Sequence, residues 1–141
     1  MKNVYICDID GTLSHNNGHR SFYDETRVIN DTPLPTCEVI DALLYSGDNN
    51  IFFNGGTDSC REDTISWLTK CTSLEDSQIK LYMRLTKDQR SDEILKEEMY
   101  NKYIKDKYNV LGVFDDRLKV CRMWYKLGLF VFNCNQGLKE F

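Results

Sequence analysis

The sequence has few of the features that mark membrane, exported or zinc-binding proteins. A transmembrane helix needs a run of about 18 apolar residues, and the 141-residue sequence contains no such run. The chain start, MKNVYICDIDGT, reaches an acid at Asp8 and lacks the apolar core of a signal peptide. The six cysteines form no C-x-x-C pair, which argues against a zinc site. We therefore expect a reduced, cytoplasmic protein without membrane contact.

The sequence also lacks a net positive charge and a P-loop. The formal net charge of -4 argues against nonspecific nucleic-acid binding over a whole basic surface, although one local pocket could still recognise a strand end. The sequence contains no G-x-x-x-x-G-K-[S/T] loop, so we expect no P-loop kinase activity. There is no internal repeat, and the length fits a single domain over residues 1–141.

Short apolar runs alternate with segments of helical periodicity. The predicted strands are 3–7, 50–53, 79–83, 110–114 and 129–132, and the predicted helices are 33–47, 58–71, 88–107 and 117–127. A polar segment, 10–32, is predicted to be a long functional loop. This alternation predicts an α/β fold, a Rossmann-like parallel five-stranded sheet with helices on both faces. The chain has room for a minimal cap and no large insertion.

Polar side chains follow three of these predicted strands directly. They are Asp8, Asn54 and Asp115. Because sites in open parallel sheets form beyond the carboxyl ends of the strands, we expect the three side chains to meet at one edge of the sheet.

The segment Asp8-Ile9-Asp10-Gly11-Thr12 places two carboxylates on either side of one apolar residue. One carboxylate can attack phosphorus and form an aspartyl-phosphate, and the second can protonate the leaving oxygen and then activate water. Gly11 allows a sharp turn after the strand. The alternative is a turn in which an aspartate caps a helix. The apolar strand before Asp8 argues against this alternative.

The pair Asp115-Asp116 follows the fourth predicted strand. Adjacent acids at a buried strand end need a counter-charge, and Mg²⁺ prefers oxygen ligands of this kind. The alternative is an N-cap for the next helix. Together with Asp8 and Asp10, the pair predicts a metal site.

Three further groups are candidates for phosphate binding. Lys96 shares a helical face with Asp92, although such a pair is more often a surface salt bridge. The turn at 54–58 could hold phosphate at a helix N-terminus, or could be a capped glycine turn. The polar loop also carries Arg20, whose guanidinium suits phosphate, beside His19.

This pattern resembles the haloacid dehalogenase-like superfamily of phosphotransferases. More narrowly, nearly the whole chain resembles the phosphatase domains of bacteriophage polynucleotide kinase-phosphatases, through DIDGTLSHNNGHRSFYD, SDEILKEEMYNKYI, FDDRLKVCRMWYKLG and FNCNQGLKEF. The resemblance implies Mg²⁺-dependent removal of 3′-terminal phosphates from RNA or DNA ends, and opening of 2′,3′-cyclic phosphates, in nucleic-acid repair. It places such a protein in the host cytoplasm if a phage encodes it.

The resemblance also implies a role for each candidate residue. Asp8 would be the nucleophile and Asp10 the general acid and base. The implied Mg²⁺ ligands are Asp8, the Asp10 carbonyl and Asp115, with Asp116 in support. The implied phosphate- and substrate-binding residues are Lys96, oriented by Asp92, together with Arg20 (or His19), Asn54 and Gly55.

One segment departs from the family pattern. The family has Ser-Gly-Arg after the second strand, where this chain has Asn54-Gly55-Gly56. An amide replaces the hydroxyl donor and the arginine is missing, although Arg61 could reach back from about 1.4 helical turns away. Two alternative functions therefore stay open: a small-molecule phosphomonoesterase on the same fold, and a weakly active domain that binds nucleic-acid ends.

Overall fold

The computed structural model describes residues 1–21, 24–47 and 49–141. Phe22 and Tyr23, which belong to the predicted loop, lie outside the described residues. Five strands form one parallel sheet in the order β5-β4-β1-β6-β7. The strands are β1 (Lys2–Cys7), β4 (Asn49–Thr57), β5 (Lys80–Arg84), β6 (Tyr108–Asp115) and β7 (Val131–Asn133). The predicted five-stranded parallel sheet is confirmed.

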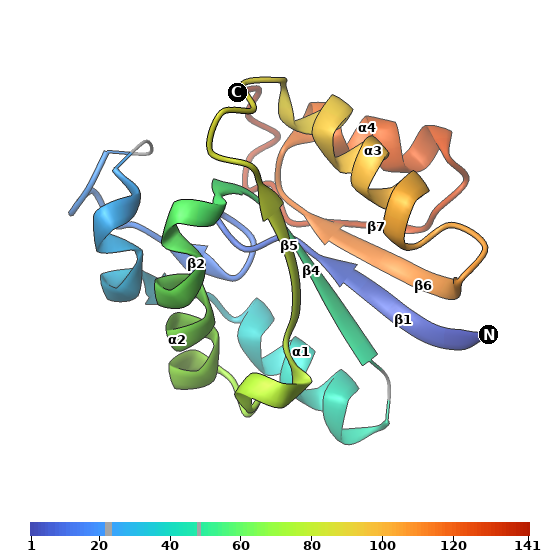
Figure 1. Ribbon diagram of the computed structural model, residues 1–141, viewed down its shortest axis with the longest axis horizontal. Helices are drawn as coiled ribbons and strands as arrows, with labels where there is room; N and C mark the ends of the chain where they lie inside the picture. Colours follow the sequence, from blue (N-terminus) through green and yellow to red (C-terminus); the bar gives the residue numbers. More distant parts are fainter. Residues whose placement is uncertain (22–23, 48) are drawn as a thin grey trace.

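Helices cover both faces of the sheet (Figure 1). They are α1 (Thr36–Tyr45) and α2 (Arg61–Cys71) on one face, and α3 (Asp92–Tyr103) and α4 (Leu118–Lys126) on the other. Alternate side chains of a strand point to opposite faces. Accordingly, Phe52 packs with Trp67 in the core under α1 and α2, whereas Ile6 packs with Trp124 in the core under α3 and α4. This two-sided burial explains why the strands are almost continuously apolar.

The order of the strands determines where a site can form. The chain passes from the central strand β1 outward to β4 and β5, and then crosses to β6 on the other side of β1. The direction of winding therefore reverses around β1, and the carboxyl ends of β1, β4 and β6 lie next to one another. Ligands bind at such reversal points in open α/β sheets.

The segment between β1 and α1 forms a small cap. It contains the antiparallel pair β2 (Ser14–His15) and β3 (Thr32–Pro33), and the 3₁₀ helix η1 (Glu25–Asn30). Sequence periodicity predicted only a loop here, because these elements are too short to show a period. The small size agrees with the predicted minimal cap.

Two contacts attach this cap to the rest of the domain. The Trp67 indole Nε1 donates to the Asp31 carbonyl oxygen at 2.8 Å. On the other side, the Glu25 carboxylate accepts from the Thr57 backbone nitrogen at 3.0 Å and from the Thr57 hydroxyl at 2.5 Å. The cap is therefore fixed both to α2 and to the end of β4.

The predicted helix 88–107 is too long, because α3 covers only Asp92–Tyr103, and the boundaries also differ around the second strand and the helix after it. β4 continues to Thr57, which pairs with Arg84 of β5 beyond an irregularity in the register after Asn54. The 3₁₀ turn η2 (Asp58–Cys60) follows, and α2 begins only at Arg61. The predicted glycine turn at a helix N-terminus is therefore wrong, because its residues extend a strand. Within the described residues, no helix is long and apolar enough to cross a bilayer.

Candidate active site

Asp8 lies directly after β1 at the floor of a cavity. Its backbone nitrogen donates to the Phe114 carbonyl oxygen at 2.9 Å, which continues the ladder with β6 and fixes the start of the turn. Its carboxylate accepts from Lys96 Nζ at 2.8 Å and from the Thr12 hydroxyl at 3.0 Å. Burial raises the pKa of Asp8 well above its usual range, against the opposing charge of Lys96. The side chain is thus held in one orientation and needs positive charge nearby.

Lys96 supplies part of that charge from α3. Only 1% of the residue is exposed, and its ammonium bridges Asp8 and Asp115, at 2.8 and 3.0 Å. Burial alone would lower the pKa of Lys96, but the charges of Asp115 and Asp8 raise it well above its usual range. Lys96 is therefore a fixed cation inside the site and not a surface salt bridge.

Three carboxylates converge beside this lysine. Asp8, Asp115 and Asp116 each offer a ligand atom, and these atoms lie within 4.8 Å of one another. Burial raises the pKa of Asp115 to about 6 and also raises that of Asp116. One ammonium does not balance three acids, and an all-oxygen set with excess negative charge suits a divalent cation. The group can therefore hold a metal ion, as the sequence predicted.

The turn after Asp8 is shaped for this cluster. Gly11 has a φ of +82°, and a Cβ at this position would lie 2.1 Å from Asp116 Oδ2. Thr12 Oγ1 contacts both Asp8 Oδ2 and Asp116 Oδ1, at 3.0 and 3.1 Å. The loop after β1 and the loop after β6 are therefore packed directly against each other.

Replacing Gly11 with alanine is expected to weaken metal binding as well as stability. A positive φ costs an alanine about 1 kcal/mol or more, and the methyl group would also displace the Asp116 carboxylate. Gly18→Ala is the matched control, since Gly18 has a φ of +77° with nothing within 4 Å of its Cβ position. Urea unfolding should show a loss of stability for both variants, but only Gly11→Ala should bind a divalent cation more weakly in a metal titration. Equal metal affinities in the two variants would contradict the packing argument.

Asp10 lies on the cap side of Asp8. Its carboxylate is 3.4 Å from the Ser14 hydroxyl and 3.7 Å from Arg20 Nη2, and burial raises its pKa. A carboxyl that keeps its proton more readily than usual suits a general acid. Its side chain is not part of the three-carboxylate group, so only its main-chain carbonyl is left as the predicted metal ligand.

The predicted substrate residue Arg20 is buried in the cap. Its guanidinium forms a bidentate pair with Asp31, with Nε–Oδ1 at 3.0 Å and Nη2–Oδ2 at 2.7 Å. His19 Nε2 lies 2.8 Å from the same carboxylate. Both candidates for the basic loop residue therefore meet Asp31, and Arg20 lines a smaller cavity of about 220 Å³ next to the main one.

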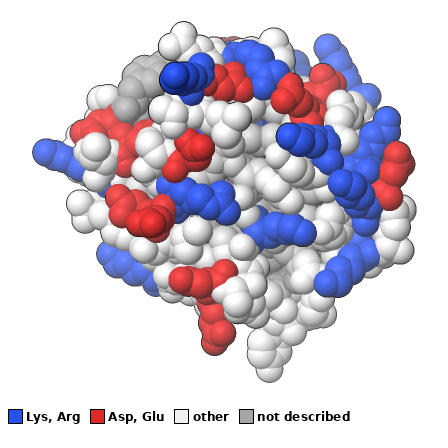
Figure 2. Space-filling view, in the orientation of Figure 1, with Lys and Arg blue, Asp and Glu red and all other residues white. Residues whose placement is uncertain are grey.

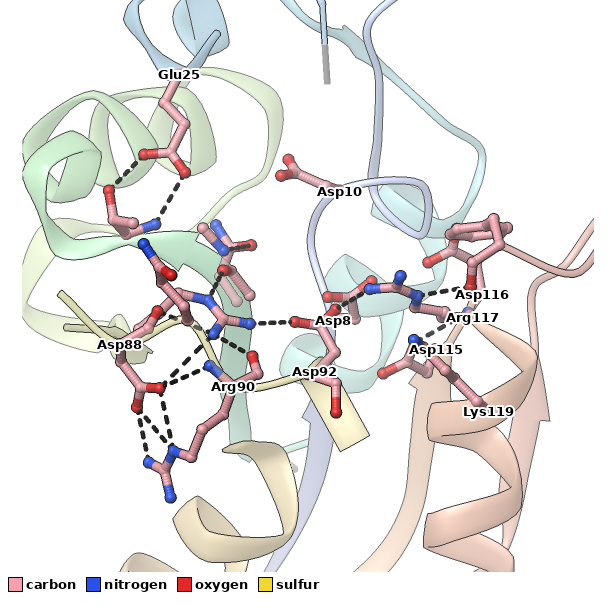
Figure 3. A pocket seen from close by; sticks show the side chains of 18 residues that line it. Asp8, Asp10, Glu25, Asp88, Arg90, Asp92, Asp115, Asp116, Arg117 and Lys119 are labelled. Carbon is pink, nitrogen blue, oxygen red and sulfur yellow. Dashed lines mark hydrogen bonds and ion pairs between the residues drawn. The ribbon is translucent and has the colours of Figure 1, made fainter. Parts of the chain in front are cut away.

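The main cavity measures about 490 Å³ and opens at the carboxyl ends of the strands. Of the predicted site residues, its walls include Asp8, Asp10, Asn54, Gly55, Asp92, Asp115 and Asp116 (Figure 3). The sequence interpretation missed four cations in the walls, which are Arg84, Arg90, Arg117 and Lys119. The sequence did contain a reason to include Arg84. It lies at the carboxyl end of β5, just as Asp8 and Asp115 lie at the carboxyl ends of β1 and β6.

Asp92 is held by two of these missed arginines, of which Arg117 is labelled in Figure 3. Arg84 Nη2 donates to Asp92 Oδ1 at 2.8 Å, and Arg117 Nη1 donates to Asp92 Oδ2 at 3.1 Å. Among the described residues Lys96 forms its ion pairs with Asp8 and Asp115, while the nearby charge of Asp92 still helps to raise the pKa of Lys96, so the orientation of Lys96 by Asp92 stays a prediction. Gly55 permits this arrangement, because a Cβ there would lie 2.4 Å from Asp92 Oδ1.

Asn54-Gly55-Gly56, the segment that departs from the family pattern, is held by local hydrogen bonds. Asn54 is 3% exposed, and its Oδ1 accepts from the Gly56 backbone nitrogen at 3.1 Å. The next backbone nitrogen, that of Thr57, is occupied by Glu25. Arg61 does not reach back, because its Nη1 donates to the Leu81 carbonyl oxygen at 2.9 Å. The proposed substitution by Arg61 is therefore wrong.

Charge on the outer surface follows no single sign. Figure 2 shows Lys and Arg side chains interspersed with Asp and Glu over the face seen in Figure 1. This distribution agrees with the net charge of -4. It favours recognition of an anionic ligand in a pocket over binding of such a ligand across a broad basic face.

Comparison with known proteins agrees with this geometry. The family profile described as "Polynucleotide kinase PNKP phosphatase domain" matches residues 2–138. A putative bifunctional polynucleotide kinase/RNA ligase of Autographa californica nuclear polyhedrosis virus is 37% identical over 142 residues, which cover 96% of this chain and 20% of the relative.

Solved structures are similar to this chain over nearly its whole length. A chain of the Pnkp1/Rnl/Hen1 complex superposes with a TM-score of 0.88 at 34% identity, over 97% of this chain and 47% of that chain. The class C acid phosphatase of Bacillus anthracis has a TM-score of 0.65 at 14% identity, over 99% of this chain and 68% of that chain, and shows the shared fold alone.

This chain spans a fifth of the viral relative and just under half of the chain in the complex. The match to the family nevertheless runs almost from end to end, over residues 2–138, a range that includes the strand-end acids and Lys96. The chain is a phosphatase with a haloacid dehalogenase-like fold, and it belongs to the family of polynucleotide kinase-phosphatase phosphatase domains.

Proposed function

We propose that this phosphatase is Mg²⁺-dependent and removes the 3′-terminal phosphate from RNA ends during repair. The observation that carries the proposal is the orientation of Asp8, whose carboxylate is fixed by Lys96 and Thr12 at the floor of an open cavity. Relatives described as a polynucleotide kinase/RNA ligase and as part of an RNA repair complex indicate the class of substrate.

The first chemical step would transfer the phosphoryl group to Asp8. A carboxylate oxygen of Asp8 attacks phosphorus, and the bond from phosphorus to the terminal 3′-oxygen breaks. Asp10 donates its proton to that leaving oxygen, which the raised pKa of its carboxyl favours. Lys96 stays beside the nucleophile and offsets the charge of the incoming phosphate. The products of this step are a free 3′-hydroxyl and an aspartyl-phosphate.

The second step would hydrolyse the aspartyl-phosphate. Asp10, now ionised, takes a proton from a water molecule, and the water oxygen attacks phosphorus. The bond from phosphorus to the Asp8 oxygen breaks, which releases inorganic phosphate and restores Asp8. Asp10 is again protonated for the next cycle.

Asp8, Asp115 and Asp116 would hold the Mg²⁺ ion, which screens the negative charge of the phosphate from that of the nucleophile. The fit rests on the donor set, which is all carboxylate oxygen and carries more negative charge than Lys96 balances. Mn²⁺ has similar ligand preferences and should substitute for Mg²⁺.

The shape of the site favours a polymer end over an enclosed small molecule. The cap is small and is attached to α2 and β4, and Glu25 is the residue of its 3₁₀ helix that lines the cavity. The cations Arg90 and Lys119 lie in the wall of the cavity, where they can meet neighbouring backbone phosphates. A strand that ends in a 3′-phosphate could therefore enter without enclosure.

The direct test is turnover of a 3′-phosphorylated RNA oligonucleotide, with the matching DNA and p-nitrophenyl phosphate as competing substrates. We expect release of phosphate from the RNA in Mg²⁺ and loss of that release in EDTA. Faster turnover of the small ester would indicate the small-molecule phosphomonoesterase instead. Tight binding of RNA ends without turnover in either Mg²⁺ or Mn²⁺ would indicate the weakly active end-binding domain.

A further inference from the structure

The main cavity and the smaller cavity beside it share part of their walls. The main cavity measures about 490 Å³, and the smaller one, which measures about 220 Å³, is lined by cap residues such as Arg20 and Asp31. Three residues line both cavities, and they are Asp10, Asp116 and Phe141. The first two are acids that the proposed mechanism uses. The shared wall therefore places one phenylalanine beside the reacting groups.

Phe141 differs in character from everything around it. Among the described residues, every other residue that lines either cavity is polar, charged or a glycine. Phe141 is 51% exposed and is a member of neither hydrophobic core. A single exposed phenylalanine on an outer surface would need no explanation, but this one lies in the wall of an active site. Its place therefore points to contact with a ligand and not to packing of the fold.

The segment that carries Phe141 is fixed to the loop after β6. Arg117 Nε donates to the Phe141 carbonyl oxygen at 2.9 Å, and the guanidinium carbon lies 5.5 Å from the centre of the ring. Asn135 Nδ2 donates to the Asp116 carbonyl oxygen at 2.8 Å and to the Lys139 carbonyl oxygen at 2.7 Å. Because these contacts hold Phe141 before any ligand arrives, a ligand that packs against its ring loses little binding energy to ordering it.

The leaving oxygen of the proposed reaction determines which part of a substrate comes near Phe141. Asp10 would protonate the 3′-oxygen of the terminal nucleotide, so the sugar that carries this oxygen must lie within reach of Asp10. Asp10 and Phe141 line the same two cavities. The base on that sugar is a flat ring, and aromatic side chains stack on bases of any sequence. Phe141 is therefore in the right place to meet the terminal base.

We propose that the base of the 3′-terminal nucleotide stacks on Phe141, which makes this residue a specificity determinant for nucleic-acid ends. The inference rests on the proposed function, because only a nucleotide substrate carries a base. Arg117 holds the ring, and about half of the residue stays exposed to receive the base. Any of the four bases can gain from this contact, whereas a small phosphate ester without a ring gains nothing.

The test uses two 3′-phosphorylated RNA oligonucleotides that are identical except that one lacks the base of its terminal nucleotide. For the parent chain we expect a KM at least about fivefold lower for the intact end, with similar kcat, because the stack forms equally in the bound substrate and in the transition state. Phe141→Leu should raise the KM for the intact end at least about fivefold and leave the KM for the abasic end within about twofold. Phe141→Tyr keeps an aromatic ring and should keep the preference.

Phe130→Leu is the matched control. Phe130 is 66% exposed, contacts the ring of Phe132 and lines neither cavity, so its replacement should leave both KM values unchanged. An equal rise in KM for both ends in Phe141→Leu would indicate a structural role and overturn the proposal. Equal KM values for the two ends in the parent chain would also overturn it, while phosphate release would still support the proposed function. Release from neither end would overturn both.

Discussion

Replacing Asp8 with asparagine is expected to lower turnover by at least about a thousandfold, as loss of a catalytic nucleophile does in other enzymes. The amide keeps the size of the side chain and a hydrogen bond to Thr12, but it cannot attack phosphorus. Lys96 retains its pair with Asp115, so the variant should remain folded. The measurement is phosphate release from the 3′-phosphorylated RNA in Mg²⁺, together with acid-quenched trapping of labelled phosphate on the protein.

A matched control for this change is Asp106→Asn. Asp106 is exposed on the turn between α3 and β6, with a φ of +63° that asparagine also adopts readily. This variant should keep full turnover and full phosphate labelling. Turnover by Asp8→Asn within tenfold of the parent chain would mean that Asp8 is not the nucleophile, and the proposed two-step mechanism would fail.

Replacing Lys96 with methionine is expected to destabilise the metal-free protein by about 3 to 5 kcal/mol, the usual cost of removing one partner from a buried ion pair. The ammonium of Lys96 bonds Asp8 and Asp115, and Asp116 lies in the same carboxylate group. Without the lysine, these buried acids lose the ammonium that offsets part of their negative charge. The measurement is the free energy of unfolding in urea, with EDTA and with Mg²⁺. Mg²⁺ should restore more stability to the variant than to the parent chain.

The stability that Lys96→Met loses should also depend on pH, with a direction that follows from the pKa of Asp115. Burial raises the pKa of Asp115 to about 6, so the folded protein binds this proton more tightly than the unfolded chain does. Stability of the metal-free parent should therefore fall as pH rises from about 4 through about 6. The pKa rises further when Lys96 is absent, so the deficit of the variant should be largest near neutral pH and shrink in acid.

Lys102→Met serves as the control for the lysine. Lys102 lies on the same helix, but it is exposed, and its Nζ lies 5.2 Å from the centre of the Tyr103 ring. This variant should lose at most about 1 kcal/mol, and its stability should not respond more strongly to Mg²⁺ than that of the parent chain. An equal loss in both variants would mean that the position of the charge within the site does not matter.

The sequence was most informative where chemistry follows directly on a buried strand. Asp8 and Asp115 could be placed because a long apolar strand that ends in an acid is unusual unless the acid has a function. The parallel order of the strands then required the two to meet, and they share Lys96 in the structure. Lys96 itself was found by its match to the family pattern, since spacing along a charged helix favoured a surface pair with Asp92.

The contacts around Asp92 could not be predicted from spacing. Arg84 and Arg117 reach it from β5 and from the loop after β6, over separations of 8 and 25 residues. Such pairs depend on how three elements pack, which no local pattern records. The same limit explains why the orientation of the Arg61 side chain was predicted wrongly. Arg61 is the first residue of α2, and the irregular end of β4 and the η2 turn determine where α2 starts. The side chain therefore points to the Leu81 carbonyl and not to the cavity.

The cap was predicted only in size. Its fold rests on contacts between distant residues, among them the pairing of Arg20 with Asp31 and the hydrogen bond from Trp67 to the Asp31 carbonyl. Arg20 reads as a phosphate ligand in the sequence because its partner is 11 residues away. The structure shows that much of its charge is already neutralised before any substrate arrives.

The two attachments of the cap bear on how substrates are sorted. An enzyme that closes over its substrate can reject molecules by volume, because a ligand that is too long prevents closure. Here the Trp67 and Glu25 contacts hold the segment over 24–33 in place on both sides. For the proposed substrate, selection would then come from groups that touch the terminal nucleotide and the adjoining backbone phosphates, and oligonucleotides that share this end but differ in length beyond it should be turned over equally well.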